Sequence, residues 1–126
     1  MLFGSLLSPA SFAAEELDAT LINMRFVKPL DEAIITAAAK NYDLIVTIED
    51  NAIQGGAGSA VSECLARLGI EVQVLHLGIP DDYIEHADRE SQLDEIGLSN
   101  EGVVRQICEY DGGRFAPSTL AKVAHL

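Results

Sequence analysis

The 126-residue sequence has no tryptophan, three histidines, two cysteines and few cations. Eight lysines and arginines stand against 20 aspartates and glutamates, so the formal net charge is -12. Nucleic acids and anionic lipids are bound through positive patches, and a charge of this sign opposes both kinds of partner. No apolar run reaches the length of a membrane-spanning helix. We therefore expect neither nucleic-acid nor membrane partners.

The scarcity of histidine and cysteine also excludes familiar reactive patterns. His76, His86 and His125 stand alone, outside any His-x-x-x-His or Cys-x-x-Cys spacing, so no metal site is expected. Cys64 and Cys108 lie 44 positions apart on apolar stripes and are expected to be buried free thiols in a reducing cytoplasm. No serine or cysteine stands in a nucleophile signature. The sequence thus offers no catalytic residue.

The length and composition are those of one domain. Apolar residues make up 48% of the 126 positions, which is enough for a sizeable core. We assign the domain to residues 1–110 and treat residues 111–126 as a tail. The apolar start resembles a secretory leader, but it lacks a cationic region and is interrupted by Gly4, Ser5, Ser8 and Pro9. We therefore expect no signal peptide and a cytoplasmic location.

Strands alternate with helices along the chain, which predicts an α/β fold with a parallel sheet covered on both faces. Alternating or continuous apolar runs indicate the strands, and capped amphipathic stripes indicate the helices. The expected strands are the end of one within Met1–Leu7, then Thr20–Val27, Leu44–Asp50 and Glu71–Leu77. The expected helices are Pro9–Asp18 after a Ser8 cap, Asp31–Asn41, Ser59–Gly69, Arg89–Ile96, and a last one that starts at Ser99 or Asn100.

The stretch from Leu44 to Gly58 is the centre of this pattern. Its first half predicts a strand buried on both faces, which ends at two carboxylates, and glycines then lead to a helix that Ser59 would cap. Ligands of open α/β sheets collect at the carboxyl ends of parallel strands. The candidate interface or ligand residues are therefore Glu49, Asp50, Asn51, Gly55, Gly56 and Gly58, together with His86 in a later polar loop.

The chemistry of this loop is less specific than its position. It lacks the lysine of a Walker motif and the spacing of a dinucleotide fingerprint, and two carboxylates would repel an anion. Tight packing of the helix on the sheet is the simpler role for the glycines. Glu49 and Asp50 are neighbours in a strand and point in opposite directions, which argues against a shared proton. His76 is expected to pack at a sheet edge rather than act as a base.

Three ordered segments carry a resemblance to a known family. They are DATLINMRFVKPLDEA at 18–33, LIVTIEDNAIQGGAGS at 44–59 and GIPDDYIEH at 78–86. Together they resemble the C-terminal domain of the 1-deoxy-D-xylulose-5-phosphate synthase family, within a similarity that covers about residues 2–107. The wider transketolase-like group, including the β subunits of 2-oxo acid dehydrogenases, shares the Arg-Phe-x-x-Pro-Leu-Asp and glycine-loop pattern.

The resemblance implies a three-layer α/β/α domain with a mostly parallel sheet that helps to build a homodimer. It implies a cytoplasmic parent enzyme that uses thiamine diphosphate and Mg²⁺ to decarboxylate pyruvate and join the two-carbon unit to glyceraldehyde 3-phosphate. That reaction feeds isoprenoid, thiamine and pyridoxal synthesis. The family's cofactor and substrate residues lie in two preceding domains, so no catalytic or cofactor-binding residue is carried over to this chain. The family domain starts with further strand residues, so we expect an N-terminally truncated version of it.

Three hypotheses follow for the function. The first is a structural and dimerising domain of a thiamine-dependent transferase, which packs on the preceding domains and is inactive alone. The second is a free-standing module that binds a small phosphorylated ligand at the glycine loop. The third is an interaction domain for a carrier protein, like that of 2-oxo acid dehydrogenase β subunits.

Overall fold

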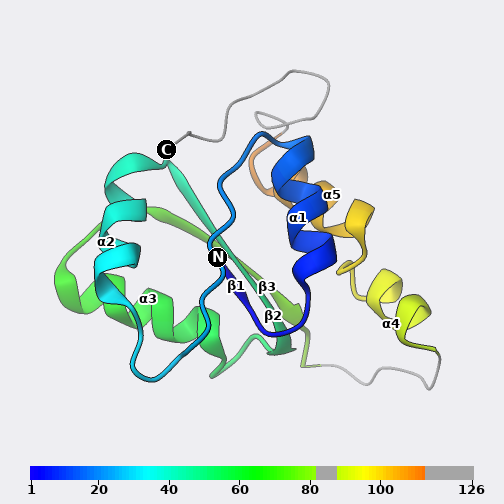
Figure 1. The fold of residues 1–126 in the computed structure, drawn as a ribbon, viewed down its shortest axis with the longest axis horizontal. Helices are drawn as coiled ribbons and strands as arrows, with labels where there is room; N and C mark the ends of the chain where they lie inside the picture. The colour runs from blue at the N-terminus through cyan, green and yellow to red at the C-terminus, as the bar shows by residue number, and fades with distance from the viewer. Residues whose placement is uncertain (82–87, 113–126) are drawn as a thin grey trace.

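The computed structural model of the protein describes residues 1–81 and 88–112. Strands and helices follow one another in the order expected of an α/β fold (Figure 1). His86 and almost all of the tail at 111–126 lie outside the described residues. The elements are β1 (Leu2–Phe3), α1 (Leu7–Glu16), α2 (Glu32–Asn41), β2 (Leu44–Ala52), α3 (Ala57–Leu68), β3 (Gln73–Ile79), α4 (Arg89–Glu95) and α5 (Asn100–Tyr110).

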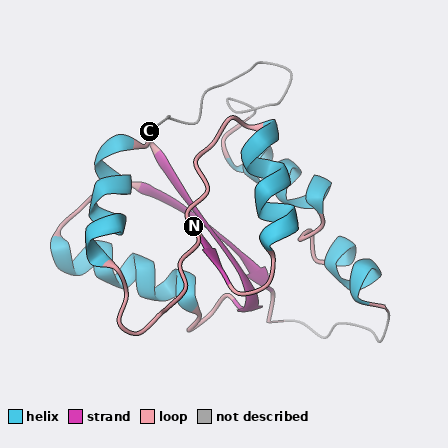
Figure 2. Ribbon diagram, in the orientation of Figure 1, coloured by secondary structure: helices cyan, strands magenta, loops and turns pink. Residues whose placement is uncertain are grey.

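The described strands form a parallel sheet in the order β1-β2-β3, with β2 in the middle. Helices α1 and α5 cover one face of this sheet, and α2 and α3 cover the other (Figure 2). Helix α4 lies farther out, beside α5. The predicted three-layer arrangement with a parallel sheet is confirmed.

The central strand β2 feeds both hydrophobic cores because its side chains alternate between the two faces. Leu44 and Ile48 pack in the core shared with α1 and α5. Ile45 packs in the core shared with α2 and α3. Thr47 and Glu49 point to that same second face and are fully buried although they are polar. Because buried polar groups need hydrogen-bond partners, the bonds of Thr47 and Glu49 hold together the strands and helix beside the glycine loop.

The strand predicted at Thr20–Val27 is the main error of the sequence-based assignment. The structure has an isolated parallel bridge between Leu2 and Asn23, not a strand. Leu2 N donates to Ile22 O and Met24 N donates to Leu2 O, both at 2.8 Å. Strand β1 has only two residues and ends before Gly4, whose φ is +93°. In the described part of the chain, the segment Thr20–Val27 therefore lacks a neighbouring strand long enough to pair with its full length.

Other boundaries differ by a few residues. Strand β2 continues to Ala52 instead of ending at Asp50, with an irregular register between Ile48 and Ala52. Strand β3 starts and ends two residues later than predicted. Helix α1 begins at Leu7, and the side chain of its cap residue Leu6 makes no capping hydrogen bond, so the predicted Ser8 cap is wrong.

The start residues predicted for α2 and α5, and the glycine predicted to end α3, are confirmed. Asp31 Oδ1 accepts from Ile34 N at 3.1 Å and starts α2, as predicted. Ser99 Oγ accepts from Gly102 N at 3.2 Å and starts α5. Gly69 closes α3 with a φ of +67°. Among the described residues, no helix is both long enough and apolar enough to cross a membrane.

Candidate functional site at the glycine loop

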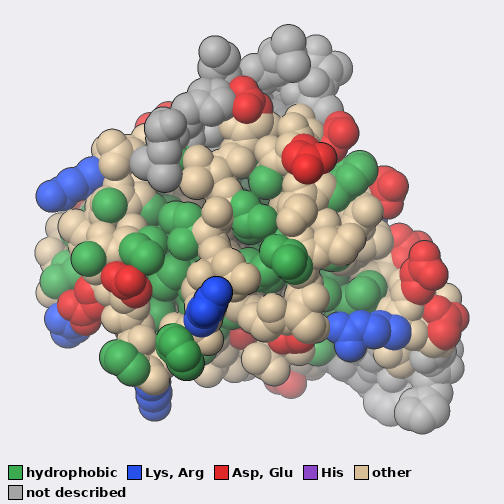
Figure 3. Space-filling model, in the orientation of Figure 1, with side chains coloured by type: hydrophobic (Ala, Val, Ile, Leu, Met, Phe, Trp, Pro, Cys, Tyr) green, Lys and Arg blue, Asp and Glu red, His purple; other side chains and the backbone are tan. Residues whose placement is uncertain are grey.

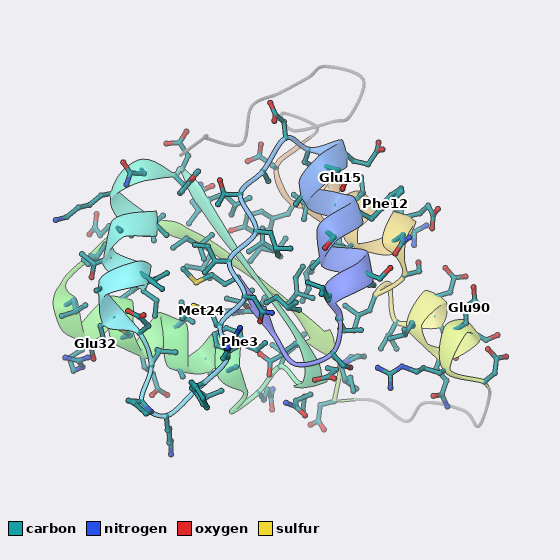
Figure 4. All side chains as sticks on the ribbon, viewed as in Figure 1. Phe3, Phe12, Glu15, Met24, Glu32 and Glu90 are labelled. Atoms are coloured by element: carbon teal, nitrogen blue, oxygen red, sulfur yellow. The ribbon has the colours of Figure 1, made fainter. Side chains whose placement is uncertain are left out.

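A cleft near the expected site lies at the carboxyl ends of β1 and β2. It has a volume of about 420 Å³. One wall is the segment after the Leu2–Asn23 bridge, which contributes Arg25 and Val27. The other wall is the glycine loop, which contributes Asn51 and Gln54 among its residues. Phe3 and Met24, which lie near each other in Figure 4, form part of its floor.

The Glu49 side chain on β2 binds the backbone at the end of the glycine loop. It is fully buried. Oε1 accepts a hydrogen bond from Ala57 N at 3.0 Å, and Oε2 accepts one from Gly58 N at 2.7 Å. These amides are the first two of α3, where unpaired N–H groups and the helix dipole favour a negative charge. Glu49 is thus an internal anion that occupies the position an external phosphate would need.

The cap of α3 therefore differs from the predicted one. The helix starts at Ala57 after Gly56, two residues before Ser59. Ser59 is already inside the helix, and its hydroxyl donates to Ile53 O at 3.1 Å. The Glu49 carboxylate, at the end of the preceding strand, accepts the hydrogen bonds of the first helix amides, a role that the sequence pattern had predicted for Ser59.

Gly55 and Gly56 serve different purposes in this loop. Gly55 has a φ of +70° and open space around it, so backbone conformation requires a glycine there. Gly56 has an ordinary extended conformation, with a φ of -83°. A Cβ on Gly56 would collide with Glu49 Oε1 and would lie 2.5 Å from Ala52 O. Backbone conformation therefore explains the glycine at position 55, and close packing explains the one at position 56.

Asp50 points to the opposite face of the sheet from Glu49. Its Oδ2 accepts from Ser5 N at 3.1 Å and from Ser5 Oγ at 2.5 Å. The Ser5 hydroxyl bond is the main cause that lowers the pKa of this carboxyl, with a smaller contribution from the Arg89 charge. Arg89 donates to Ser5 Oγ at 2.8 Å. Asp50 therefore ties the β1–α1 turn to β2 and α4, and it does not line the cleft.

His76 on β3 connects three elements. Its Nδ1 lies 2.5 Å from Thr47 Oγ1 on β2, and its Nε2 lies 2.8 Å from Ser62 Oγ on α3. Burial lowers the pKa of the imidazole, and the Glu49 charge opposes this effect in part. Gly58 makes room for the contact, since a Cβ there would lie 2.5 Å from Nδ1. The packed, sheet-edge role predicted for His76 is what the structure has.

The chemistry available at this site is that of packing and recognition. Among the described residues, no group of three or more His, Cys, Asp or Glu side chains could hold a metal ion. Cys64 is buried and Cys108 is half-buried, and burial raises the pKa of the Cys108 thiol, which disfavours its nucleophilic thiolate form. A separate apolar cavity of about 80 Å³ between α1, α2 and β2 is lined by aliphatic side chains with Thr20 and Tyr42, whose hydroxyls lie 2.7 Å apart.

The structure brings together some of the predicted residues and adds others. Glu49, Gly55, Gly56 and Gly58 form one unit around the start of α3. Asn51 is exposed on the cleft wall. Sequence reasoning missed Arg25 and Val27 as cleft residues. The sequence signal for them is the absence of any acidic residue from 19 to 30 in a strongly acidic chain.

The chain is similar in sequence to one family of domains and to a group of enzymes that carry such a domain. The family described as "Transketolase, C-terminal domain" matches residues 2–103. The 1-deoxy-D-xylulose-5-phosphate synthase of Nitrosococcus oceani is 53% identical over 108 residues, which are 86% of this chain and 17% of that protein. The synthase of Thioalkalivibrio sulfidiphilus is 56% identical over 105 residues, covering 83% of the chain and 16% of the relative. That of Pseudomonas savastanoi pv. phaseolicola is 55% identical over 109 residues, covering 86% and 17%.

The chain therefore spans about a sixth of the length of these relatives, between 16% and 17%. A solved structure described as a split-gene transketolase, an inactive β4 tetramer, superposes with a TM-score of 0.75 at 24% identity. It covers 98% of this chain and 39% of that one. At this identity the structural likeness supports the fold alone.

Proposed function

Because the chain belongs to the family of transketolase C-terminal domains, we propose that it is the C-terminal structural and dimerising domain of a 1-deoxy-D-xylulose-5-phosphate synthase. The observation that carries the proposal is the identity of 53–56% to such synthases over most of this chain and about a sixth of theirs. In the longer enzyme, which we place in the cytoplasm, other domains would supply the catalytic centre. This chain would supply a rigid body that packs on them.

The proposed reaction of the longer enzyme is the condensation of pyruvate with glyceraldehyde 3-phosphate, with loss of CO₂. Thiamine diphosphate with Mg²⁺ supplies the carbanion chemistry of such a reaction when bound. The described residues of this chain do not fit that group. They contain no cluster of carboxylates and histidines for a metal ion, and the anion-binding end of α3 is taken by Glu49. We assign cofactor and substrate binding to the domains outside this chain.

The same observation weighs against the phosphorylated-ligand module. A phosphate at the glycine loop would need the free amides at the start of α3. Ala57 N and Gly58 N already donate to the buried carboxylate, and displacing it would leave an unpaired charge inside the protein. The loop is better explained as a packed junction between strand and helix.

Two measurements test the proposal. Calorimetric titration of the isolated chain with thiamine diphosphate and Mg²⁺ is expected to give no binding heat at micromolar concentration. A chimera, in which this chain replaces the matched C-terminal region of the Nitrosococcus oceani synthase, is expected to sediment with the oligomeric mass of the parent synthase. Cofactor binding by the chain alone, or a chimera that folds but has lost the parent's oligomeric state, would contradict the proposed role.

A further inference from the structure

One exposed segment has the composition of a docking surface. Arg25, Phe26, Val27 and Lys28, here called the loop patch, follow the buried Met24 and lie on the surface. Phe26 is 68% exposed, more than any other large hydrophobic side chain in the described part of the chain. Backbone bonds from Leu2 hold the segment just before the patch. The loop patch thus exposes an aromatic ring and two cations directly after a backbone segment that hydrogen bonds hold to β1.

The charge of the loop patch is opposite to that of the molecule. Residues 19–30 contain two cations and no acidic side chain, in a chain with a net charge of -12. Residues 88–111 contain seven acidic and two basic side chains. Figure 3 shows basic and hydrophobic side chains together in the lower left and centre, and most of the acidic ones toward the top and right. Neither Arg25 nor Lys28 forms an ion pair with a residue that the structure describes.

The loop patch is also continuous with the glycine-loop cleft. Arg25 and Val27 line that cleft, opposite the exposed amide side chains of Asn51 and Gln54. An exposed aromatic residue flanked by arginine, next to a hollow with uncharged hydrogen-bonding groups, is the composition typical of the centre of a protein interface. The aromatic ring supplies apolar area, and the cations select an acidic partner.

We propose that the loop patch is the surface through which this chain docks on another domain of the longer enzyme, at an acidic rim around an apolar pocket that receives Phe26. This inference rests on the proposed function. The same patch on a second copy of the chain is a poorer fit, because two-fold pairing of the patch with itself would bring Arg25 and Lys28 of both copies together. Anionic lipid is a poorer fit because two cations are few against the net charge of -12.

The test compares amide hydrogen exchange at residues 24–28 in the isolated chain and in the Nitrosococcus oceani chimera. Docking is expected to slow exchange of these amides by about tenfold or more in the chimera. The double variant Arg25→Glu with Phe26→Ser is expected to abolish the protection. The control, Lys40→Glu with Leu68→Ser, makes the same charge change and removes another exposed apolar side chain, and it is expected to keep the protection. Both isolated variants should melt like the isolated parent, since all four side chains are exposed.

Three results would overturn the inference in different ways. A chimera that makes product while residues 24–28 exchange as fast as in the isolated chain refutes the docking surface and leaves the proposed function intact. A soluble chimera that makes no product refutes the proposed function and the inference with it. Protection that rises with the concentration of the isolated chain assigns the patch to a second copy, which refutes the acidic domain as its partner.

Discussion

At the scale of single residues, Glu49 decides what the glycine loop can do. A carboxylate buried at the start of a helix is stable because two amides and the helix dipole compensate its charge. The same arrangement removes the donors that would make the loop a phosphate site. A residue that looks like a candidate acid or base in the sequence is therefore a structural cap supplied from the neighbouring strand.

Replacing Glu49 by glutamine is expected to lower the free energy of unfolding by about 2 kcal/mol. Glutamine keeps the shape, but its amide group turns one donor toward a backbone N–H and the charge is lost. Asp50→Asn is the matched control, because Asp50 is partly exposed and bonds to the exposed Ser5. Its cost should stay below about 1 kcal/mol. Urea denaturation of both variants measures the difference, and equal costs would refute the special role of Glu49.

The two neighbouring glycines give a second residue-scale prediction. Gly56→Ala should cost about 2–3 kcal/mol, because its Cβ meets Glu49 and the backbone at Ala52. Gly55→Ala should cost roughly 1–2 kcal/mol through its positive φ alone. Asparagine tolerates such a φ, so Gly55→Asn should recover part of the loss whereas Gly56→Asn should not. If asparagine rescues Gly56 instead, the roles assigned to the two glycines are reversed.

Residue identities predicted the glycine turn but not its cap. The Ser-x-x pattern before an apolar stripe placed the helix start at Ser59, because local patterns register only neighbours in sequence. The actual cap comes from Glu49, eight positions before Ala57, and depends on the strand passing beneath the helix. The alternation of side chains along a strand correctly predicted that Glu49 and Asp50 point to opposite faces of the sheet. Which of them meets a helix end required the tertiary structure.

At the scale of elements, His76 joins β3 to β2 and α3 through the hydroxyls of Thr47 and Ser62. Burial lowers its folded-state pKa below the 6.5 of an exposed histidine. The unfolded chain therefore binds more protons just below that pH, and the free energy of unfolding falls as the pH decreases through this window. The Met1 amine, whose pKa burial lowers to about 5, acts in the same direction.

The contribution of His76 can be separated by comparing the parent with His76→Gln, since both keep the same Met1 amine. We expect the parent to lose stability more steeply than the variant as the pH is lowered from about 7 to about 5. Thermal melts at matched pH values supply the two slopes. Parallel slopes would show that the histidine is not desolvated and that its hydrogen bonds do not depend on the neutral ring.

Element types were predictable from the sequence, and the failed strand shows where that ends. Thr20–Val27 has the composition of a strand, and two backbone hydrogen bonds join its Ile22 and Met24 to Leu2. A strand also needs a partner of matching length, and β1 offers two residues before Gly4 turns the chain. The composition of a segment indicates its tendency to form a strand, whereas strand pairing depends on residues elsewhere in the chain.

At the scale of the whole molecule, we expect the isolated chain to form a homodimer. In the described sheet, β1 and β3 are the two edges, and beyond β1 there is only the isolated Leu2–Asn23 bridge. Exposed edges and apolar patches are templates for another chain. The net charge of -12 limits nonspecific aggregation and favours a defined species. The segment Met1–Leu7 or the loop at Glu49–Gly58 is expected near the contact. Sedimentation equilibrium at micromolar concentration checks this, and a monomer mass independent of concentration would contradict it.

The catalytic rate of the chimera decides whether this chain can serve as the C-terminal domain of a 1-deoxy-D-xylulose-5-phosphate synthase. The assay follows 1-deoxy-D-xylulose 5-phosphate formed from pyruvate and glyceraldehyde 3-phosphate, beside a synthase that lacks the matched region. We predict that the chimera reaches within about tenfold of the parent kcat and that the deletion has no activity, because remote packing positions the reacting groups. A correctly folded chimera that is as inactive as the deletion would refute this role of the chain.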